Sequence, residues 1–431
     1  MINRDNYLNQ LIRKKENGLV KVITGLRRSG KSFLLFTIYH NYLIANGIKK
    51  NHIIEIALDD IKDQKYWNPN ELDKYIRKHI IDDGSINYIF IDEIQFVKDI
   101  DNPYLKGSVV GFTDVILGLM KIKNVDIYVT GSNSEMLSKN ILTKFRGRGD
   151  QIHVYPLSYK EFYDAYNTEK SRAFEEYITY GGMPFVMSIN DYADKSNYLK
   201  NLFLEIYIKD IIENNDIRND ESIINDLLNI ISSSIGSLTN PLKLANTFKS
   251  LKKVTINPTT IDKYLDYCVD SFLIERVKRY DIKSKKFIES PLKYYFTDIG
   301  LRNARLNFSE IEETHIMENI IFNELKCRGF NVNVGIVEYN YKDEEGKSKR
   351  KQLEIDFVCN KGNERIYIQF AYAIPTIDKI NQEIRGFLRI NDSFKRIVVV
   401  RNNIVPKKDE NGIQYVGIEE FLLNDKYTAN N

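Results

Sequence analysis

Residues 25–32 read Gly-Leu-Arg-Arg-Ser-Gly-Lys-Ser, the complete G-x-x-x-x-G-K-[ST] pattern of a phosphate-binding loop. The loop follows an apolar run, Val20–Thr24, and precedes a helix-like segment at residues 33–42. A triphosphate must be wrapped closely by backbone N–H groups, and only glycine allows the required turn and close approach. The order of strand, loop and helix therefore predicts a nucleotide site and disfavours a chance match.

The residues of this loop have distinct expected roles toward ATP and Mg²⁺. Lys31 should reach the β- and γ-phosphates, and the Ser32 hydroxyl should be a ligand of Mg²⁺. The residues expected to line the nucleotide are Gly25, Leu26, Arg27, Arg28, Ser29, Gly30, Lys31 and Ser32.

A second motif at residues 87–93 reads Asn-Tyr-Ile-Phe-Ile-Asp-Glu, an apolar strand that ends in two carboxylates. Alone, such a strand end is more often a solvated turn, but at about sixty residues after a phosphate loop it predicts a Walker B segment. We expect Asp92 to hold Mg²⁺ through water and Glu93 to orient and polarise the attacking water.

Two further apolar segments are expected to be strands of the same sheet. Residues 52–57 lie between the two motifs in sequence, and residues 125–130 follow them and lead into Gly-Ser-Asn. A strand inserted between the motifs, together with Glu93, favours an ATPase that activates water with a carboxylate over a GTPase or a small-molecule kinase. Asn133 would then be a sensor of the γ-phosphate or the lytic water. The alternative for Asn133 is a helix N-cap.

The chain resembles the prokaryotic AAA-type ATPases that carry a C-terminal domain of the PD-(D/E)xK nuclease type. Ordered motifs carry the resemblance: 25–32, 91–95 (Ile-Asp-Glu-Ile-Gln), 130–133 (Thr-Gly-Ser-Asn), 145–148 (Phe-Arg-Gly-Arg), 155–162, 180–184 (Tyr-Gly-Gly-Met-Pro), 207–211 and 293–302. The resemblance implies an α/β fold: a P-loop NTPase parallel sheet with helices, then a helical, winged-helix segment and a small restriction-endonuclease-like domain.

Four parts are expected along the 431 residues, which exceed what one core usually organises. They are an AAA-type P-loop ATPase core at 1–157, its helical extension at 158–215, a winged-helix-like domain at 216–307 and a degenerate PD-(D/E)xK nuclease-like domain at 308–431.

Composition constrains the class of protein only loosely. The formal net charge of +3 provides no global electrostatic argument for nucleic-acid binding. Charges interrupt every apolar run before the eighteen or so residues that a membrane span needs, and residues 1–6 lack a signal-peptide core. We therefore expect a cytoplasmic protein without membrane contact. The three widely spaced cysteines exclude a zinc ribbon and disfavour a disulfide scaffold.

Arg146 and Arg148 precede the segment expected to form the last strand of the ATPase sheet. In this class of ATPase, one arginine at such a place can be a finger that acts in trans or a phosphate-sensing residue. The alternative is a loop arginine that contacts solvent or a carboxylate. A trans finger would require a homo-oligomer.

The order of elements at 216–307 is that of a winged helix, with residues 258–270 in the recognition-helix position. The surface residues expected on that helix are mostly acidic: Asp262, Lys263, Asp266 and Asp270. A helix that reads a major groove usually carries Arg, Lys, Asn or Gln instead, so protein contact or coupling to the last domain is favoured. Lysines 283, 285 and 286 in the wing either touch phosphates or form a solvated turn.

The resemblance places Glu318 and Asp356 at metal positions of the nuclease-like core. The D/E-x-K triplet is replaced by Gln369-Phe370-Ala371, so one metal carboxylate and the lysine are missing. An amide binds Mg²⁺ weakly and an alanine cannot assist proton transfer. We expect an inactive fold kept for binding or assembly.

The sequence thus predicts an enzyme that binds and hydrolyses ATP to drive a conformational cycle on DNA or a protein client. The alternative is a nucleotide-switched scaffold with negligible turnover. A weaker alternative is an ATP-regulated, metal-dependent nuclease. Glu93 favours the first, because a pure binding switch needs no carboxylate to activate water.

Overall fold

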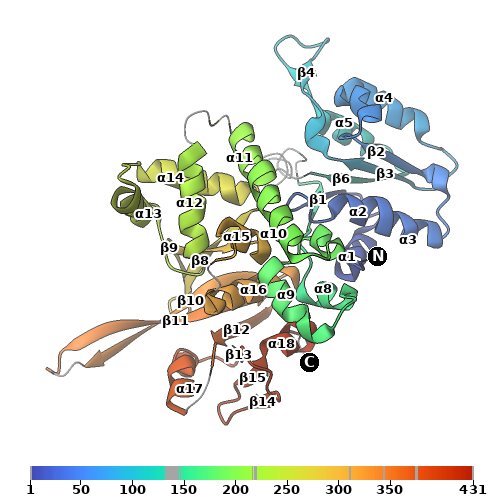
Figure 1. Ribbon diagram of the computed structural model, residues 1–431. Coiled ribbons are helices and arrows are strands. Elements are labelled where there is room, and N and C mark those ends of the chain that lie inside the picture. Colours follow the sequence, from blue (N-terminus) through green and yellow to red (C-terminus); the bar gives the residue numbers. More distant parts are fainter. Residues whose placement is uncertain are drawn as a thin grey trace. The chain divides into compact units, whose positions relative to one another are not determined.

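The computed structural model describes residues 2–131, 145, 147–215, 217, 221–309, 312–342, 345–373 and 377–429 (Figure 1). The chain forms two compact units. The first comprises Met1–Pro156 with Asp270–Phe272, and the second comprises Leu157–Val269 with Leu273–Asn431. The helices expected as an extension of the ATPase, at 158–215, therefore group with the second unit.

The first unit is built on a five-stranded parallel sheet in the order β2-β3-β6-β1-β7. Its strands are β1 (Val20–Thr24), β2 (Ile53–Ala57), β3 (Asn87–Asp92), β6 (Val125–Thr130) and β7 (Gly149–His153). A short hairpin, β4 (Ile100–Asp101) with β5 (Val109–Val110), stands apart from this sheet.

The strand that separates the two nucleotide motifs in the sheet is β6. Strand β2, which lies between the motifs in sequence, pairs only with β3 and forms the edge. The inserted strand expected at 52–57 is therefore corrected to 125–130. The registers Ile23↔Thr130 and Ile91↔Val129 bring the ends of β1, β6 and β3 level. Because all three are parallel, the residues that follow them share one edge of the sheet.

Helices cover both faces of this sheet (Figure 1). On one face, α4 (Pro69–His79) and α5 (Phe112–Leu119) bury Leu72, Ile76 and Ile116 against it. On the other, α1 (Asp5–Lys14) packs beside a continuous helical stretch made of α2 (Lys31–Phe33), a π-helical segment (Leu34–Tyr39) and α3 (His40–Ala45). The helix expected at 33–42 is thus longer, and it begins at the phosphate loop.

The second unit begins with helices and contains most of the remaining ones. They are α8 (Tyr159–Ala165), α9 (Ala173–Tyr180), α10 (Tyr192–Asn201), α11 (Lys209–Asn214), α12 (Glu221–Ser233), α13 (Pro241–Thr247), α14 (Pro258–Asp270), α15 (Ile299–Arg305), α16 (Glu313–Cys327), α17 (Ile377–Ile384) and α18 (Ile418–Leu423). Across the described part of the chain, none of the helices has the length and apolar character that a membrane crossing demands.

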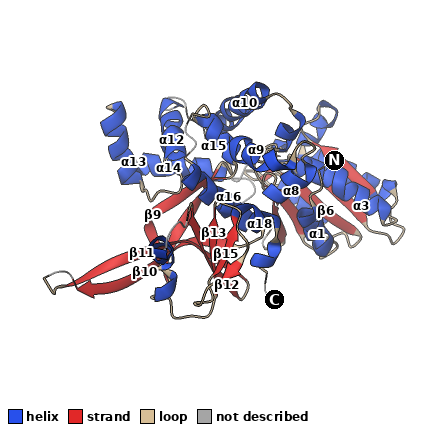
Figure 2. Cartoon of the chain, turned by 60° about the horizontal axis from the view of Figure 1, so that its bottom comes forward, coloured by secondary structure: helices blue, strands red, loops and turns tan. Residues whose placement is uncertain are grey.

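An eight-stranded mixed sheet contains both the hairpin expected to be a wing and the strands expected in the C-terminal domain, as Figure 2 shows. Its order is β14-β15-β13-β12-β11-β10-β8-β9, with bounds β8 (Ile274–Asp281), β9 (Lys286–Phe296), β10 (Asn331–Lys342), β11 (Ser348–Lys361), β12 (Glu364–Ala371), β13 (Lys395–Val400), β14 (Lys407–Lys408) and β15 (Gln414–Gly417). The expected boundary at 307/308 does not separate two sheets, because β8 of the wing pairs in parallel with β10.

The acidic face expected on α14 has a structural explanation. Arg276 of β8 forms ion pairs with Asp262 at 3.2 Å and with Asp266 at 2.9 Å. These carboxylates therefore attach α14 to the hairpin, and they do not form a surface suited to a DNA groove.

Asp298 joins two of the sequence motifs within the second unit. Its carboxylate accepts hydrogen bonds from Gly182 N at 2.7 Å and from Leu301 N, at the start of α15, at 3.0 Å. A Cβ atom at Gly181 would meet Asp298 Oδ1 at 2.3 Å, and one at Gly182 would meet the carbonyl oxygen of Leu157 at 2.2 Å, which explains the glycine pair at 181–182. The neighbouring Asn303 donates to the carbonyls of Ile178 and Thr179, so α15 is tied to the end of α9.

Replacement of Asp298 by alanine should lower the free energy of unfolding by about 1–3 kcal/mol, because two buried backbone donors lose their acceptor. The urea midpoint followed by circular dichroism measures this loss. Asp191→Ala is the matched control, since Asp191 also caps a helix but is exposed. An unchanged midpoint for Asp298→Ala would contradict the assigned role.

Burial raises the pKa of Asp298 from its ordinary value of 3.8 to about 6. Because the pKa of Asp298 is higher in the folded protein than in the unfolded chain, its protonation adds to the free energy of unfolding. This contribution is fully present below the pKa of the unfolded chain and is lost as the pH rises through about 6. Asp298→Asn removes this titration, so the unfolding free energy of the variant minus that of the wild type should increase across the window. A difference that is independent of pH would refute the assignment.

Candidate functional site

The loop between β1 and α2 has the backbone geometry of a phosphate cradle. Gly25 has φ 139° and Gly30 has φ 95°, both in the region that favours glycine. A Cβ atom at Gly25 would lie 2.1 Å from the carbonyl oxygen of Val154, so no other residue fits there. Arg28 is also left-handed, with φ 64°, and Arg27 and Arg28 are both exposed.

Lys31 lies inside this loop and is only 3% exposed. Its Nζ donates to the carbonyl oxygens of Gly25 and Leu26, each at 3.0 Å. Desolvation lowers the pKa of Lys31, while the nearby carboxylates of Glu93 and Asp92 act in the opposite direction. The structure thus brings the lysine of the first motif into the field of the two carboxylates of the second.

Asp92, the last residue of β3, is held by two hydroxyl groups. Ser32 of the phosphate loop and Thr130 at the end of β6 both hydrogen-bond to its carboxylate. Burial raises the pKa of Asp92, and these two hydrogen bonds oppose that rise. The pair Ser32 and Asp92, expected to serve one Mg²⁺, is therefore in direct contact.

Glu93 occupies the turn directly after β3 in a left-handed conformation, with φ 52°. Its backbone N–H donates to Thr130 Oγ1 at 3.0 Å, and its carboxylate accepts a hydrogen bond from the side chain of Gln95. Non-glycine residues in this conformation are often found at functional sites, where surrounding contacts maintain them. Glu93 is partly exposed.

Three residues of the site were not identified from the sequence. Gln95 and Thr130 lie in the motifs at 91–95 and 130–133, but neither residue was expected to have a role in the site. Arg4 lies outside every motif, and its buried guanidinium donates to the carbonyls of Ser29 at 3.1 Å and Tyr155 at 2.7 Å, which anchors the phosphate loop. A buried arginine near the start of a chain has no sequence pattern that would reveal it.

The residues present suit ATP with Mg²⁺. The Ser29 hydroxyl, inside the loop, is fully buried and has no hydrogen-bond partner among the described residues. Ser32 and Asp92 offer the hard oxygen donors that Mg²⁺ prefers. Lys31 adds the cation that a triphosphate requires.

Of the remaining expected site residues, Asn133 and Arg146 lie outside the described residues. Arg148 is exposed, and its carbonyl accepts a hydrogen bond from Val20 N at 2.9 Å, where β1 begins. The phosphate loop follows the other end of β1, four steps of about 3.3 Å away. Arg148 is thus not brought to Lys31, and a phosphate-sensing role within one chain is not supported.

The expected nuclease-like positions lie together in the second unit, around an unexpected lysine. Lys293 of β9 pairs with Glu318 of α16 and with Glu354 of β11, both at 2.8 Å, and it is only 3% exposed. The Tyr295 hydroxyl also donates to Glu318. An ammonium group therefore stands among the carboxylates that a metal would need.

Asp356 and Gln369 complete this cluster on adjacent strands. Asp356 N donates to Gln369 Oε1 at 3.3 Å, and Phe370 N donates to Asp356 Oδ2 at 2.8 Å. Burial, reinforced by Glu318, raises the pKa of Asp356 to about 8. Within the residues that the structure describes, no three His, Cys, Asp or Glu side chains form a group that could hold a metal ion.

Comparisons with known proteins agree with the first unit's geometry. Residues 17–163 match an AAA domain family (AAA_14), while residues 171–312 and 313–421 match two domains of unknown function, DUF8612 and DUF4143. An uncharacterized protein of Haemophilus influenzae is 33% identical over 98% of this chain and 99% of its own length. The uncharacterized protein MJ1544 of Methanocaldococcus jannaschii is 30% identical over 99% of this chain and 88% of its own.

The chain therefore belongs to the family of these two proteins, and its first unit is an AAA-type ATPase domain. Among solved structures, a Walker-type ATPase of Pyrococcus abyssi aligns with TM-score 0.47 at 15% identity, covering 71% of this chain and 96% of that chain. AMPPCP-bound DnaA of Aquifex aeolicus aligns with TM-score 0.31 at 13% identity, covering 62% of this chain and 87% of that chain. Both scores lie below 0.5, so the family assignment rests on the AAA match and the two relatives.

Thr130→Val should reduce ATP turnover by about 10- to 100-fold, because Asp92 and the Glu93 N–H both lose their hydroxyl partner. Thr130→Ser, which retains the hydroxyl, should keep most of the activity. The two variants are compared by steady-state phosphate release at saturating ATP. Equal turnover in Thr130→Val and wild type would remove Thr130 from the site.

Proposed function

We propose that the protein binds ATP with Mg²⁺, hydrolyses it, and couples nucleotide state to a conformational change. One observation carries this proposal: Lys31 and Ser32 after β1 lie beside Asp92 and Glu93 after β3, at one edge of a parallel sheet. The proposal is also supported by the AAA match over residues 17–163.

Each residue has a role that its contacts suit. Residues 25–32 wrap the triphosphate with backbone N–H groups, and Lys31 leaves the carbonyls of Gly25 and Leu26 to neutralise the phosphates. Ser32 and Asp92 would hold Mg²⁺, which neutralises charge on the transferred phosphoryl group when bound. Glu93 orients the attacking water and accepts its proton.

Thr130 and Gln95 act as positioning residues for this chemistry. Thr130 links the end of β6 to both acidic residues, and Gln95 fixes the carboxylate of Glu93. A rearrangement of the Gln95 contact when ATP enters would release Glu93 toward water, which would couple catalysis to occupancy.

Arginine 148 fits a role in trans. It is exposed at the sheet edge opposite the phosphate loop, so it could reach the nucleotide of a second copy only in a homo-oligomer. Asn133 is proposed as the sensor of the γ-phosphate.

The target of the conformational cycle is proposed to be DNA or a protein client, in the cytoplasm. The second unit is proposed to be a PD-(D/E)xK-like fold without nuclease activity, because Lys293 pairs with Glu318 and Glu354 and the catalytic lysine of the triplet is absent. A nucleotide-switched scaffold with negligible turnover is the second candidate, and the contact between Glu93 and Gln95 favours it if that contact persists with ATP.

Lys31→Ala should lose ATP binding by at least about 100-fold, because a buried cation that faces the phosphates is removed. Glu93→Gln should bind ATP like the wild type but hydrolyse it at least about 100-fold more slowly, because the amide cannot accept a proton. Binding is measured by isothermal titration calorimetry and turnover by steady-state phosphate release. Full turnover in Glu93→Gln would remove the role assigned to Glu93, and slow turnover in the wild type itself would favour the scaffold.

A further inference from the structure

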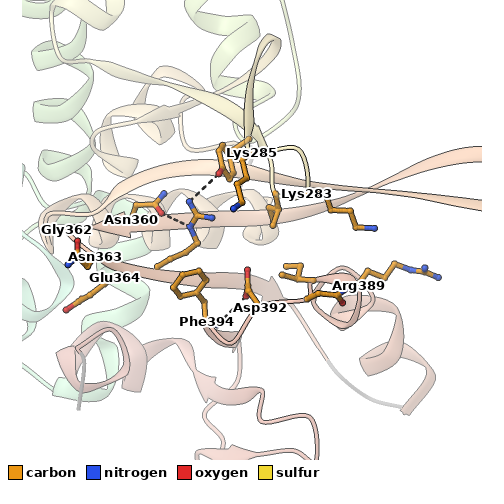
Figure 3. Close-up of a pocket in the computed structure, with 14 residues that line it drawn as sticks. Lys283, Lys285, Asn360, Gly362, Asn363, Glu364, Arg389, Asp392 and Phe394 are labelled. Atoms are coloured by element: carbon orange, nitrogen blue, oxygen red, sulfur yellow. Dashed lines mark hydrogen bonds between the residues drawn. The ribbon is translucent and has the colours of Figure 1, made fainter.

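A cavity of about 740 Å³ opens in the second unit, and none of the residues that line it belongs to the acidic cluster around Lys293 (Figure 3). Its walls come from the β8–β9 turn, the β11–β12 turn and the segment between α17 and β13. Four cationic side chains line it: Lys283, Lys285, Arg365 and Arg389. In Figure 3, Lys285 extends toward the space above Phe394 and Asp392.

Arg365 is held in place before any ligand arrives. Its guanidinium lies 5.0 Å from the ring centroid of Tyr280 and 5.6 Å from that of Phe394. Its Nε donates to Asn360 Oδ1 at 2.8 Å, and its Nη2 donates to the Tyr280 hydroxyl at 3.4 Å. A guanidinium that is fixed in this way loses little entropy when it binds an anion.

The cavity also has a positive charge balance. Its two acidic residues are Glu364 and Asp392, against four cations. Asp392 already accepts a hydrogen bond from the Tyr367 hydroxyl at 2.7 Å and pairs with Arg396 at 3.9 Å. Its carboxylate therefore already interacts with a hydroxyl and a cation that are not among the residues lining the cavity.

A basic strand continues this surface. The first residues of β11, 348–351, read Ser-Lys-Arg-Lys and are exposed. Lys351 is the cross-strand partner of Tyr339 of β10. The guanidinium of Arg389 lies over the ring of Tyr339, 3.9 Å from the ring centroid. Lys283 Nζ also donates to the carbonyl of Glu338 at 2.8 Å. The cations of the cavity thus continue onto Lys351 of the hairpin formed by β10 and β11. Figure 1 shows this hairpin extending away from the rest of the sheet.

We propose that this cavity and the β10–β11 hairpin bind a single-stranded nucleic acid, with one nucleotide seated in the cavity. Lysine and arginine side chains bind its phosphates, and the ring of Phe394, which is 40% exposed, offers a base a stacking surface. A duplex would hide its bases from this ring. The cavity contains none of the residues assigned to ATP hydrolysis. The inference rests on the proposed function in one respect, because it specifies the DNA target named there as a single strand.

The test uses the full-length protein without ATP and a fluorescein-labelled oligo(dT) of about 12 nucleotides, read by fluorescence anisotropy from about 50 to 200 mM salt. The wild type should bind with a salt-dependent affinity. The double variant Lys283→Glu, Lys285→Glu should bind at least tenfold more weakly, and its salt slope should fall by about 1.4, or about 0.7 for each lost phosphate contact.

Lys160→Glu is the matched control, because Lys160 is an exposed lysine of the same unit on α8. It should bind the oligonucleotide like the wild type. Phe394→Ala should weaken binding by about 5- to 100-fold without changing the salt slope, because it removes stacking and no charge. ATP turnover should be the same in all these proteins, which separates this proposal from the one on ATP hydrolysis.

Three outcomes of the binding measurements would overturn the inference, and a competition experiment supplies a fourth. They are the absence of strand binding by the wild type at low salt, wild-type affinity in the double lysine variant, and tighter binding to a duplex of equal length. Displacement of the strand by AMP at equal nucleotide concentration would also contradict it, since it would show that the cavity takes free mononucleotides and gains nothing from the hairpin.

Discussion

The hydroxyl group of Thr130 is the contact on which the nucleotide site depends. It donates to Asp92 and accepts from the N–H of Glu93, so the end of β6 holds both acidic residues at the end of β3. Thr130 can make both contacts only because β6 lies between β1 and β3 in the sheet. Ser32 then connects the same carboxylate to the phosphate loop, and Arg4 fixes that loop from the far side. These hydrogen bonds hold Asp92, Glu93 and the phosphate loop together, and they depend on the order of the strands in the sheet.

The parts of this site that could be predicted are those written in contiguous sequence. The phosphate loop and the strand ending in Asp92-Glu93 need particular residues at fixed spacing, and the glycine at 25 is required by the carbonyl of Val154. Strand order depends on pairing between distant segments, so β2 was taken for the inserted strand. Arg4, Thr130 and Lys293 act through contacts that no local pattern encodes.

The second unit shows the same contrast. Its helices and strands follow from apolar periodicity, but the parallel pairing of β8 with β10, which merges the wing with the C-terminal sheet, is non-local. Gln369-Phe370-Ala371 at the place of the expected D/E-x-K triplet could be read from the sequence, whereas the internal cation Lys293 could not. The buried Lys293 balances the charges of Glu318 and Glu354, so these two carboxylates need no metal ion for that purpose. Four other cationic side chains line the cavity at the β11–β12 turn.

A single-turnover experiment tests the central claim most directly. Protein in excess over ATP is mixed with and without Mg²⁺, and both phosphate release and the bound nucleotide are followed. A site in which Lys31, Ser32, Asp92 and Glu93 act together predicts stoichiometric conversion of bound ATP to ADP that requires Mg²⁺. Tight binding of ATP with no phosphate release in the presence of Mg²⁺ would contradict the account, and would identify the first unit as a nucleotide-binding module without hydrolysis.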